Sequence, residues 1–301
     1  MIFDYFSPAF VKKLEKFQLA SKKASLKSNM GELLAQRGQS LEFEEYKEYT
    51  EGDEFKHIDW NLYSRLDKLY VKVFKGERSL GVSVVLDASG SMGVPRKDDK
   101  FLYAKRIAIA LAYMALIRKN KVKMIIIGGR RGKKREIVSE TPFFQNVPRI
   151  KQMVAFMEDF KTGGLATFGE SLQKTIYRNK DVGTLFMVSD FLVDSGAELG
   201  LINFLKARNF DINFIHIRGE HEINPSQRVG AIKVLDCETR EEKTIFLSAA
   251  NREKLKREFE RREKAIKETC HRNRANYVLA ETSTPIEDLI MKTLTRSRIL
   301  R

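Results

Sequence analysis

The stretch Gly81-Val-Ser-Val-Val-Leu-Asp-Ala-Ser-Gly-Ser-Met92 decides the fold of this chain of 301 residues. Its apolar run ends abruptly at Asp87, and Ser89 and Ser91 follow at alternate positions. A short apolar run of this kind predicts a buried strand, with Asp-x-Ser-x-Ser as the loop at its carboxyl end. Ligands bind at that edge in open α/β sheets. Three short oxygen ligands from one loop suit a hard divalent cation such as Mg2+.

The sequence from residue 81 onward predicts strands that alternate with helices. A broad apolar face predicts a helix over 100–118, and an apolar run predicts a strand over 122–128. Further strands are predicted at 184–190, 210–217 and 276–280. Such alternation argues for a mostly parallel sheet flanked by helices. We therefore predict an α/β, Rossmann-like domain.

Residues 1–78 have a different character. Residues 8–40 predict a helix, and residues 41–46 and 69–74 predict strands separated by a turn at Gly52-Asp53. Asp59 beside the only tryptophan, Trp60, indicates a buried polar contact next to an aromatic anchor. We therefore divide the chain into an N-terminal helix plus β extension, 1–78, and the α/β domain, 79–301, which carries a small β insertion at about residues 220–248.

Composition narrows the class of protein. Hydrophobic residues make up 43% of the chain, which is enough for a sizeable core. No apolar run approaches the ~18 residues of a membrane span, and the N-terminus lacks the basic and apolar regions of a signal peptide. The two cysteines, Cys237 and Cys270, do not have metal-ligand spacing. These features fit a reducing, cytoplasmic setting.

The net charge of +15 raises the alternative of a nucleic-acid partner. Most lysines and arginines are spread among acidic residues, so we do not expect nucleic-acid binding. The basic, Gly-rich segment Gly128-Gly-Arg-Arg-Gly-Lys-Lys-Arg135 is not a Walker A loop, because no Ser or Thr follows the lysine at the required place. It predicts the tip of a β-hairpin.

Other oxygen ligands are expected to join the first loop. Asp190 ends a second predicted strand, and Thr167 lies in a Gly-rich loop before a helix. If the two strands are neighbours, Asp87, Ser89, Ser91, Thr167 and Asp190 converge on one edge of the sheet. Octahedral oxygen coordination with one open position suits Mg2+ or Mn2+. An ion with few directly bound carboxylates stays electrophilic and accepts an Asp or Glu side chain from another protein.

This pattern resembles the von Willebrand factor A domain and its metal-ion-dependent adhesion site. Asp87-Ala-Ser-Gly-Ser91 matches the Asp-x-Ser-x-Ser element, and Asp190 matches the later aspartate. The resemblance covers residues 79–301 by strand and helix order. It departs at Gly163-Gly-Leu-Ala-Thr167, where the usual threonine falls on Ala166. Either the loop is reshaped so that Thr167 reaches the metal, or that ligand is missing and the affinity is weak.

The segment before the strand is similar to the family called domain of unknown function 58. The matching elements are Tyr49-x-x-Gly-Asp-x-x-Lys-x-Ile-Asp-Trp60, Arg65, Leu69-Tyr-Val-Lys-x-Phe74, Glu77 and the later Ser189-Asp-Phe191. Lys56 stands where the family usually has arginine, so a bidentate contact to a carboxylate would be lost there. The resemblance implies a cytoplasmic protein of bacteria or archaea, often encoded beside a MoxR-type AAA+ ATPase. It also implies an adaptor or chaperone-like role without an established catalytic activity.

Two hypotheses of enzyme function are alternatives to a protein-binding function. Asp87 could be the nucleophile of a Mg2+-dependent phosphotransferase, but the second aspartate that haloacid-dehalogenase-type enzymes place two residues later is Ser89 here. A serine hydrolase is excluded, because Gly-x-Ser-x-Gly is absent and the four histidines have no marked partner. In a third reading Ser89 and Ser91 cap the next turn and bind nothing. We predict a metal-dependent protein-binding module rather than an enzyme.

Overall fold

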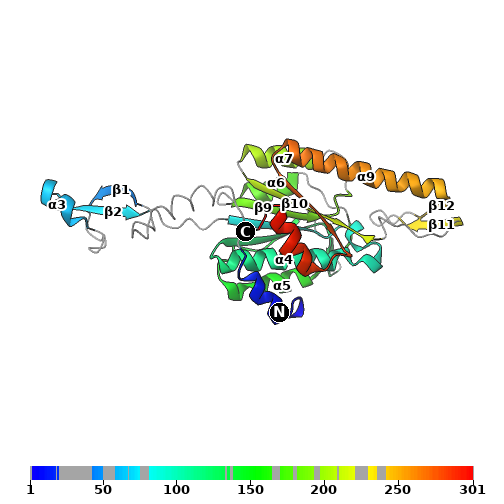
Figure 1. Cartoon of the computed structure of the whole chain (residues 1–301), viewed down its shortest axis with the longest axis horizontal. Helices are drawn as coiled ribbons and strands as arrows, with labels where there is room; N and C mark the ends of the chain where they lie inside the picture. Colours follow the sequence, from blue (N-terminus) through cyan, green and yellow to red (C-terminus); the bar gives the residue numbers. More distant parts are fainter. Residues whose placement is uncertain are drawn as a thin grey trace. The chain divides into compact units, whose positions relative to one another are not determined.

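The structure is a computed structural model (Figure 1). It describes residues 2–17, 19, 43–49, 58–66, 68–74, 81–132, 134–135, 138–164, 170–178, 182–192, 197–208, 210–220, 230–235 and 242–300. The chain forms two compact units, one of Met1–Ser21 with Leu80–Arg301 and one of Lys22–Ser79. The sequence-based division placed the N-terminal helix with the β extension instead. The structure groups this helix with the larger unit because its apolar side chains enter that unit's core.

A six-stranded sheet forms the centre of the larger unit. Its strand order is β13-β10-β9-β3-β4-β7. All neighbouring pairs are parallel except β4 with β7, which is antiparallel. This confirms the predicted mostly parallel, Rossmann-like α/β fold. The strands are β3 (Gly81–Asp87), β4 (Lys121–Ile127), β7 (Val138–Glu140), β9 (Val182–Ser189), β10 (Asp211–Arg218) and β13 (Asn276–Glu281).

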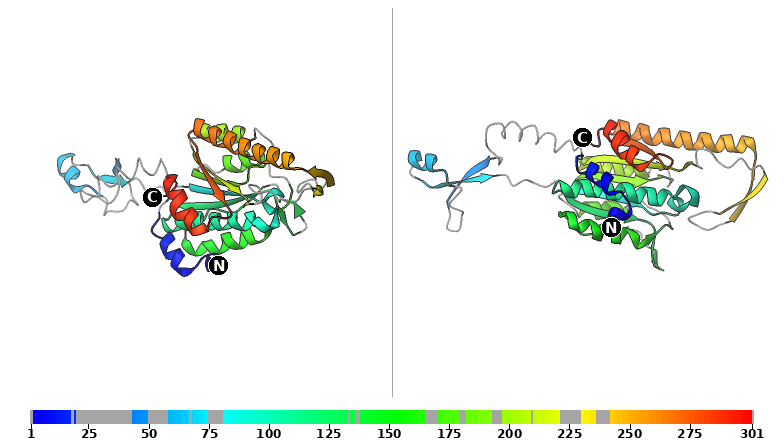
Figure 2. Two further views of the ribbon diagram at one scale, coloured as in Figure 1. Left: turned by 45° about the vertical axis from the view of Figure 1, so that its right-hand side comes forward. Right: turned by 60° about the horizontal axis from the view of Figure 1, so that its bottom comes forward.

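Helices cover both faces of this sheet (Figure 2). One hydrophobic core joins Val84 and Leu86 to the helices α1 (Pro8–Leu14), α4 (Lys100–Ile117) and α5 (Ile150–Glu158) and to the C-terminal segments α10 (Ile286–Asp288) and η6 (Leu289–Leu294). The other core joins Val85 to α6 (Glu170–Tyr177), α7 (Ala197–Ala207) and α9 (Ala249–Arg272). Alternate residues of β3 face opposite cores, as the period of a strand requires.

Strand β3 explains why the opening stretch organises the fold. Every residue of β3 is buried. The chain proceeds from β3 to β4 on one side and later places β9 on the other side. The strand order therefore reverses between β3 and β9, and such a switch point opens a ligand-binding crevice at the carboxyl ends of the strands. Asp87 is the last residue of β3, and Asp190 directly follows β9.

The N-terminal helix is short. Ser7 caps it by accepting a hydrogen bond from the amide of Phe10, and Pro8 occupies its first position. Phe10 and Leu14 are buried against the core that contains α4. The helix ends at Leu14, earlier than the predicted range of 8–40. Residues 20–42 lie outside the described residues, so the rest of that prediction stays untested.

The smaller unit contains an antiparallel pair and a short helix. Strand β1 (Phe43–Glu48) pairs with β2 (Tyr70–Phe74), and α3 (Trp60–Leu66) lies between them in sequence. Asp59 caps α3 by accepting hydrogen bonds from the amides of Asn61 and Leu62, and it also accepts one from the hydroxyl of Tyr46. The predicted polar contact is therefore present, and Asp59 itself is buried, although Tyr46 is exposed. Trp60, however, is 62% exposed and does not serve as a buried anchor.

Short antiparallel pairs complete the described chain. Strands β5 (Arg130–Arg131) and β6 (Lys134–Arg135) form the predicted basic hairpin, and β5 also pairs with β8 (Phe160–Lys161). Strands β11 (Gly230–Leu235) and β12 (Glu242–Leu247) pair within the segment of the expected β insertion. Within the described residues, no helix combines the length and apolar character needed to cross a bilayer.

Candidate functional site

Two aspartates meet at the reversal of strand order. The register pairs Leu86 of β3 with Val188 of β9, so the two strands end almost level. Asp87 and Asp190 therefore lie at the same edge of the sheet, and both side chains are buried, with residue exposures of 0% and 1%. Burying two carboxyl groups is costly unless hydrogen bonds or cations compensate them.

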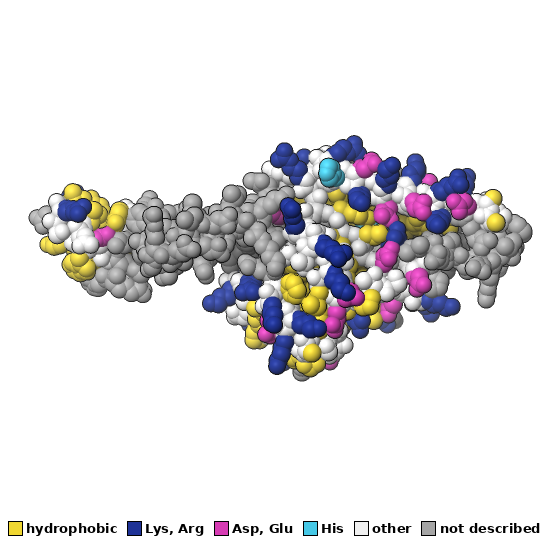
Figure 3. Space-filling view, in the orientation of Figure 1, with side chains coloured by type: hydrophobic (Ala, Val, Ile, Leu, Met, Phe, Trp, Pro, Cys, Tyr) yellow, Lys and Arg dark blue, Asp and Glu magenta, His cyan; other side chains and the backbone are white. Residues whose placement is uncertain are grey.

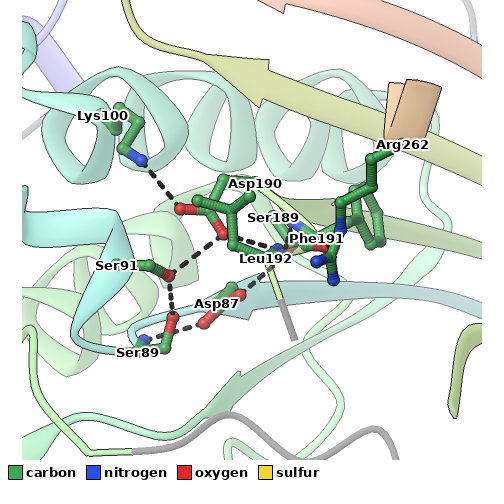
Figure 4. A network of polar contacts seen from close by, with 9 residues as sticks. All are labelled: Asp87, Ser89, Ser91, Lys100, Ser189, Asp190, Phe191, Leu192 and Arg262. Carbon is green, nitrogen blue, oxygen red and sulfur yellow. Dashed lines mark hydrogen bonds and ion pairs between the residues drawn. The ribbon is translucent and has the colours of Figure 1, made fainter. Parts of the chain in front are cut away.

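Hydrogen bonds connect both aspartates to the serine loop (Figure 4). The Ser89 amide donates to Asp87 Oδ1 at 2.8 Å, and the Ser89 and Ser91 Oγ atoms lie 3.0 Å apart. Ser91 Oγ donates to Asp190 Oδ1 at 3.1 Å. Ser189 Oγ donates to the other oxygen of Asp87 at 2.5 Å. The four predicted ligands that the structure describes thus converge. Thr167 lies outside the described residues.

The Gly-rich loop that leads toward residue 167 begins beside this site. The Gly163 amide donates to the Ala88 carbonyl at 3.0 Å, and the Gly90 amide donates to the Gly164 carbonyl at 2.9 Å. Both contacts hold residues 163–164 against the Asp-x-Ser-x-Ser loop. Direct coordination by Thr167 stays a prediction.

Lys100 also belongs to the site, and sequence reasoning missed it. Its ammonium lies 2.8 Å from Asp190 Oδ2, and its side chain has 0% exposure. Lys100 is the first residue of α4, so its place within a strongly apolar helix concealed its contact with the site. One signal was available, because the helix macrodipole disfavours a cation at a helix N-terminus. A lysine at that position calls for a carboxylate partner.

Comparison with known families assigns the chain to one of them. A family model described as protein of unknown function DUF58 matches residues 45–269. The chain belongs to the DUF58 family. Among curated proteins, the comparison finds no match for this DUF58 member.

Two solved structures are similar to this DUF58 protein. The conserved hypothetical protein BatB from Bacteroides thetaiotaomicron has 11% sequence identity and a TM-score of 0.42, with 73% of this chain and 98% of that chain covered. An aerotolerance-related membrane protein from Bacteroides fragilis, with multiple mutations to serines, has 14% identity and a TM-score of 0.40, with 72% and 100% covered.

The electrostatics of this DUF58 site favour a cation. Burial raises the pKa of Asp87 to about 7, and the negative charge of Asp190 adds to the rise. Hydrogen bonds from Ser189 and Ser89 oppose it. A positive charge close to Asp87 would lower its raised pKa and so favour the ionised carboxylate. A bound cation and the ionised form of Asp87 would therefore stabilise each other.

The donor atoms fit a hard divalent ion. The side chains of Asp87, Ser89, Ser91 and Asp190 offer only oxygen, which suits Mg2+ or Mn2+ better than softer metals. Within the part of the chain that the structure describes, no group of three or more His, Cys, Asp or Glu side chains could hold a metal ion. A metal ion bound by these residues would therefore have at most two carboxylate ligands, with serine hydroxyls or water in its other positions.

The turn after β9 fixes Asp190. Ser189 Oγ accepts a hydrogen bond from the Phe191 amide at 2.9 Å, and Asp190 Oδ1 accepts one from the Leu192 amide at 3.2 Å. Arg262 of α9 donates from Nε to the Phe191 carbonyl at 3.0 Å. Phe191 has a φ of +50°, which is unfavourable for a bulky residue. Its ring is fully buried, and that burial holds the turn in this conformation.

His216 packs behind this turn in a structural role. Its Nδ1 lies 2.8 Å from the hydroxyl of Tyr277, and its ring meets that of Phe191 edge-on, with centroids 5.5 Å apart. Burial lowers the pKa of His216 to about 4, with help from the positive charges of Arg218 and Lys100, so the imidazole is neutral at pH 7. The sequence-based statement that the histidines have no marked partner is wrong for His216.

Gly129 lies between β4 and β5, against Ala88 of the Asp-x-Ser-x-Ser loop. Alanine there is expected to destabilise the fold by about 2–3 kcal/mol. A Cβ at Gly129 would lie 2.9 Å from the Cβ of Ala88, and its φ of +84° disfavours any side chain. Gly132→Ala is the matched control, because its φ is +61° and no described residue has an atom within 4 Å of the added Cβ. That control is expected to lose only about 1 kcal/mol in urea unfolding. Equal losses at the two positions would show that the close approach to Ala88 is unimportant.

Proposed function

We propose that this chain is a metal-dependent protein-binding adaptor or chaperone-like module. Asp87, Ser89 and Ser91 would hold a Mg2+ ion, with Asp190 and Thr167 completing the site, and the ion would dock an acidic side chain of a partner protein. The observation that carries the proposal is a chain of hydrogen bonds across the site. The Ser89 amide donates to Asp87, the Ser89 and Ser91 hydroxyls contact each other, and the Ser91 hydroxyl donates to Asp190. The resemblance of Asp-x-Ser-x-Ser to the metal-ion-dependent adhesion site of von Willebrand factor A domains supports it.

The proposal assigns binding rather than catalysis to Asp87. Both oxygens of Asp87 accept hydrogen bonds, and its side chain is fully buried, so attack on a phosphoryl group would require the loop to open. Ser89 occupies the place where a phosphotransferase of this kind needs its general acid. A phosphatase screen in Mg2+ separates the two functions, since turnover that Asp87→Asn abolishes would overturn the assignment.

The proposed partner is a MoxR-type AAA+ ATPase, or another protein with an exposed Asp or Glu. Membership of the DUF58 family supports this choice, together with the cytoplasmic location that the family resemblance implies. We do not propose a nucleic-acid partner. On the face of the larger unit shown in Figure 3, acidic side chains lie among the basic ones, whereas a phosphate backbone calls for a continuous basic stripe.

Mg2+ is expected to raise the melting temperature of the wild-type protein. At a concentration 100-fold above Kd, a ligand that binds only the folded state stabilises it by about 2.7 kcal/mol. Ser89→Ala and Asp87→Asn are expected to remove most of this gain, measured by differential scanning calorimetry with and without chelator. Ser83→Ala is the matched control, because Ser83 is a buried serine of β3 whose hydroxyl has no hydrogen-bond partner among the described residues. A wild-type melting temperature that does not change with Mg2+ would show that the wild-type protein does not bind the ion and would contradict its proposed metal-dependent function.

The partner is tested by affinity capture from the native cell. The wild-type protein is expected to retain an AAA+ ATPase in Mg2+ buffer and to release it when the ion is chelated. Ser89→Ala should lose this protein, and Ser83→Ala should keep it. Equal recovery of the ATPase by wild type and Ser89→Ala would show that docking does not use the metal site.

A further inference from the structure

The candidate site contains a cation of its own. The ammonium of Lys100 contacts Asp190 Oδ2, while Asp190 Oδ1 accepts the hydrogen bond from Ser91. One carboxylate therefore links the buried lysine directly to the serine loop proposed to hold Mg2+ (Figure 4). A buried ammonium needs an anion nearby, because removing either charge from water is costly without the other.

We propose that Lys100 sets the affinity of this site for divalent cations by competing for Asp190. The inference rests on the proposed metal-binding function and adds a determinant of it. Of the two carboxyl groups at this edge, Asp190 contacts the lysine ammonium, and Asp87 accepts hydrogen bonds from Ser89 and Ser189. A divalent ion that reaches Asp190 must share that carboxylate with Lys100 or displace its ammonium. Repulsion between the two cations at this short range weakens binding of the metal ion.

The position of Lys100 fits this role. Its backbone is fixed as the first residue of α4, whose following turns are packed into the core, whereas its ammonium ends a flexible four-carbon stem. The ammonium can therefore move within the site while its backbone stays in place. We expect weak Mg2+ binding in the wild type, with the lysine yielding Asp190 as the ion enters.

The test is a Mg2+ titration by isothermal calorimetry on the full chain. Lys100→Met removes the charge and keeps most of the stem, and it is expected to lower the Kd for Mg2+ by about tenfold or more. Lys100→Gln is the second variant, for use if the Lys100→Met protein does not fold. It also removes the charge, but its neutral amide can still donate a hydrogen bond to Asp190. Lys105→Met is the matched control, since Lys105 lies on the same helix but has its ammonium 4.4 Å from the ring of Phe101. Its Kd should equal that of the wild type.

The outcomes separate this inference from the proposed function. If the wild type binds Mg2+ with a Kd as low as that of folded Lys100→Met or Lys100→Gln, the inference is overturned and the proposed metal site is unaffected. Tight binding by Lys100→Gln without measurable binding by the wild type would support the inference and contradict a metal-loaded resting site. Failure of every folded variant to bind Mg2+ would overturn both.

Discussion

Asp190→Ala is expected to lower the free energy of unfolding by about 3–5 kcal/mol. Asp190 accepts hydrogen bonds from Ser91, Leu192 and the Lys100 ammonium, and the ion pair is completely buried. Alanine removes the negative charge but leaves the lysine charge in the same low-dielectric surroundings. The loss is measured by urea unfolding in chelator, followed by circular dichroism, so that no metal contributes.

A double-mutant cycle isolates the ion pair. The double variant of Lys100→Met with Asp190→Ala is expected to be more stable than Asp190→Ala alone, because a buried pair can be replaced by apolar groups at little net cost. Asp190→Asn should lie between wild type and alanine, since its amide oxygen still accepts from Ser91 and Leu192. Additive losses for Lys100→Met and Asp190→Ala would show that the two side chains are not coupled and would remove the energetic basis of the network.

Much of the larger unit could be predicted from the sequence because its elements carry strong apolar patterns. The run Val82–Leu86 is buried on both faces, and α4 has a broad apolar surface that only a core helix needs. The predicted strand at 122–128 and helix at 100–118 agree with β4 and α4 to within one residue at each end. The predicted N-terminal helix continued past Leu14, where α1 ends, because the apolar spacing up to Phe17 shows no clear stop signal. The part of that prediction over residues 20–40 lies outside the described residues.

Only part of the candidate site could be predicted from the sequence, because apolar patterns predict where strands end but not how loops and helix ends pack together. Asp87 and Asp190 each end an apolar strand, so their convergence follows from the order of parallel strands. The contact between Lys100 and Asp190 depends on how the first turn of α4 meets the turn after β9, and no periodic pattern encodes that meeting. The pairing of His216 with Tyr277 likewise depends on the neighbouring register of β10 and β13.

Phe191→Ala is expected to cost about 3–5 kcal/mol of unfolding free energy. The ring is fully buried, with its centroid 5.1 Å from that of Phe214 and 5.5 Å from that of His216. Alanine would leave a cavity behind the turn that holds Asp190. The backbone strain would remain, because alanine also disfavours the left-handed conformation that Phe191 adopts.

Glycine at the same position separates packing from backbone strain. Phe191→Gly opens the same cavity but relieves the positive φ, so it should be more stable than Phe191→Ala by about 1 kcal/mol. The order should reverse at Phe214, which is equally buried but lies in strand β10. There glycine should be less stable than alanine by roughly 0.5–1 kcal/mol, because it gains no conformational relief and loses more chain entropy. Urea unfolding of the four variants decides the point. If glycine is the worse replacement at both positions, the turn at Phe191 is not strained, and the loss in Phe191→Ala comes from the packing of its ring.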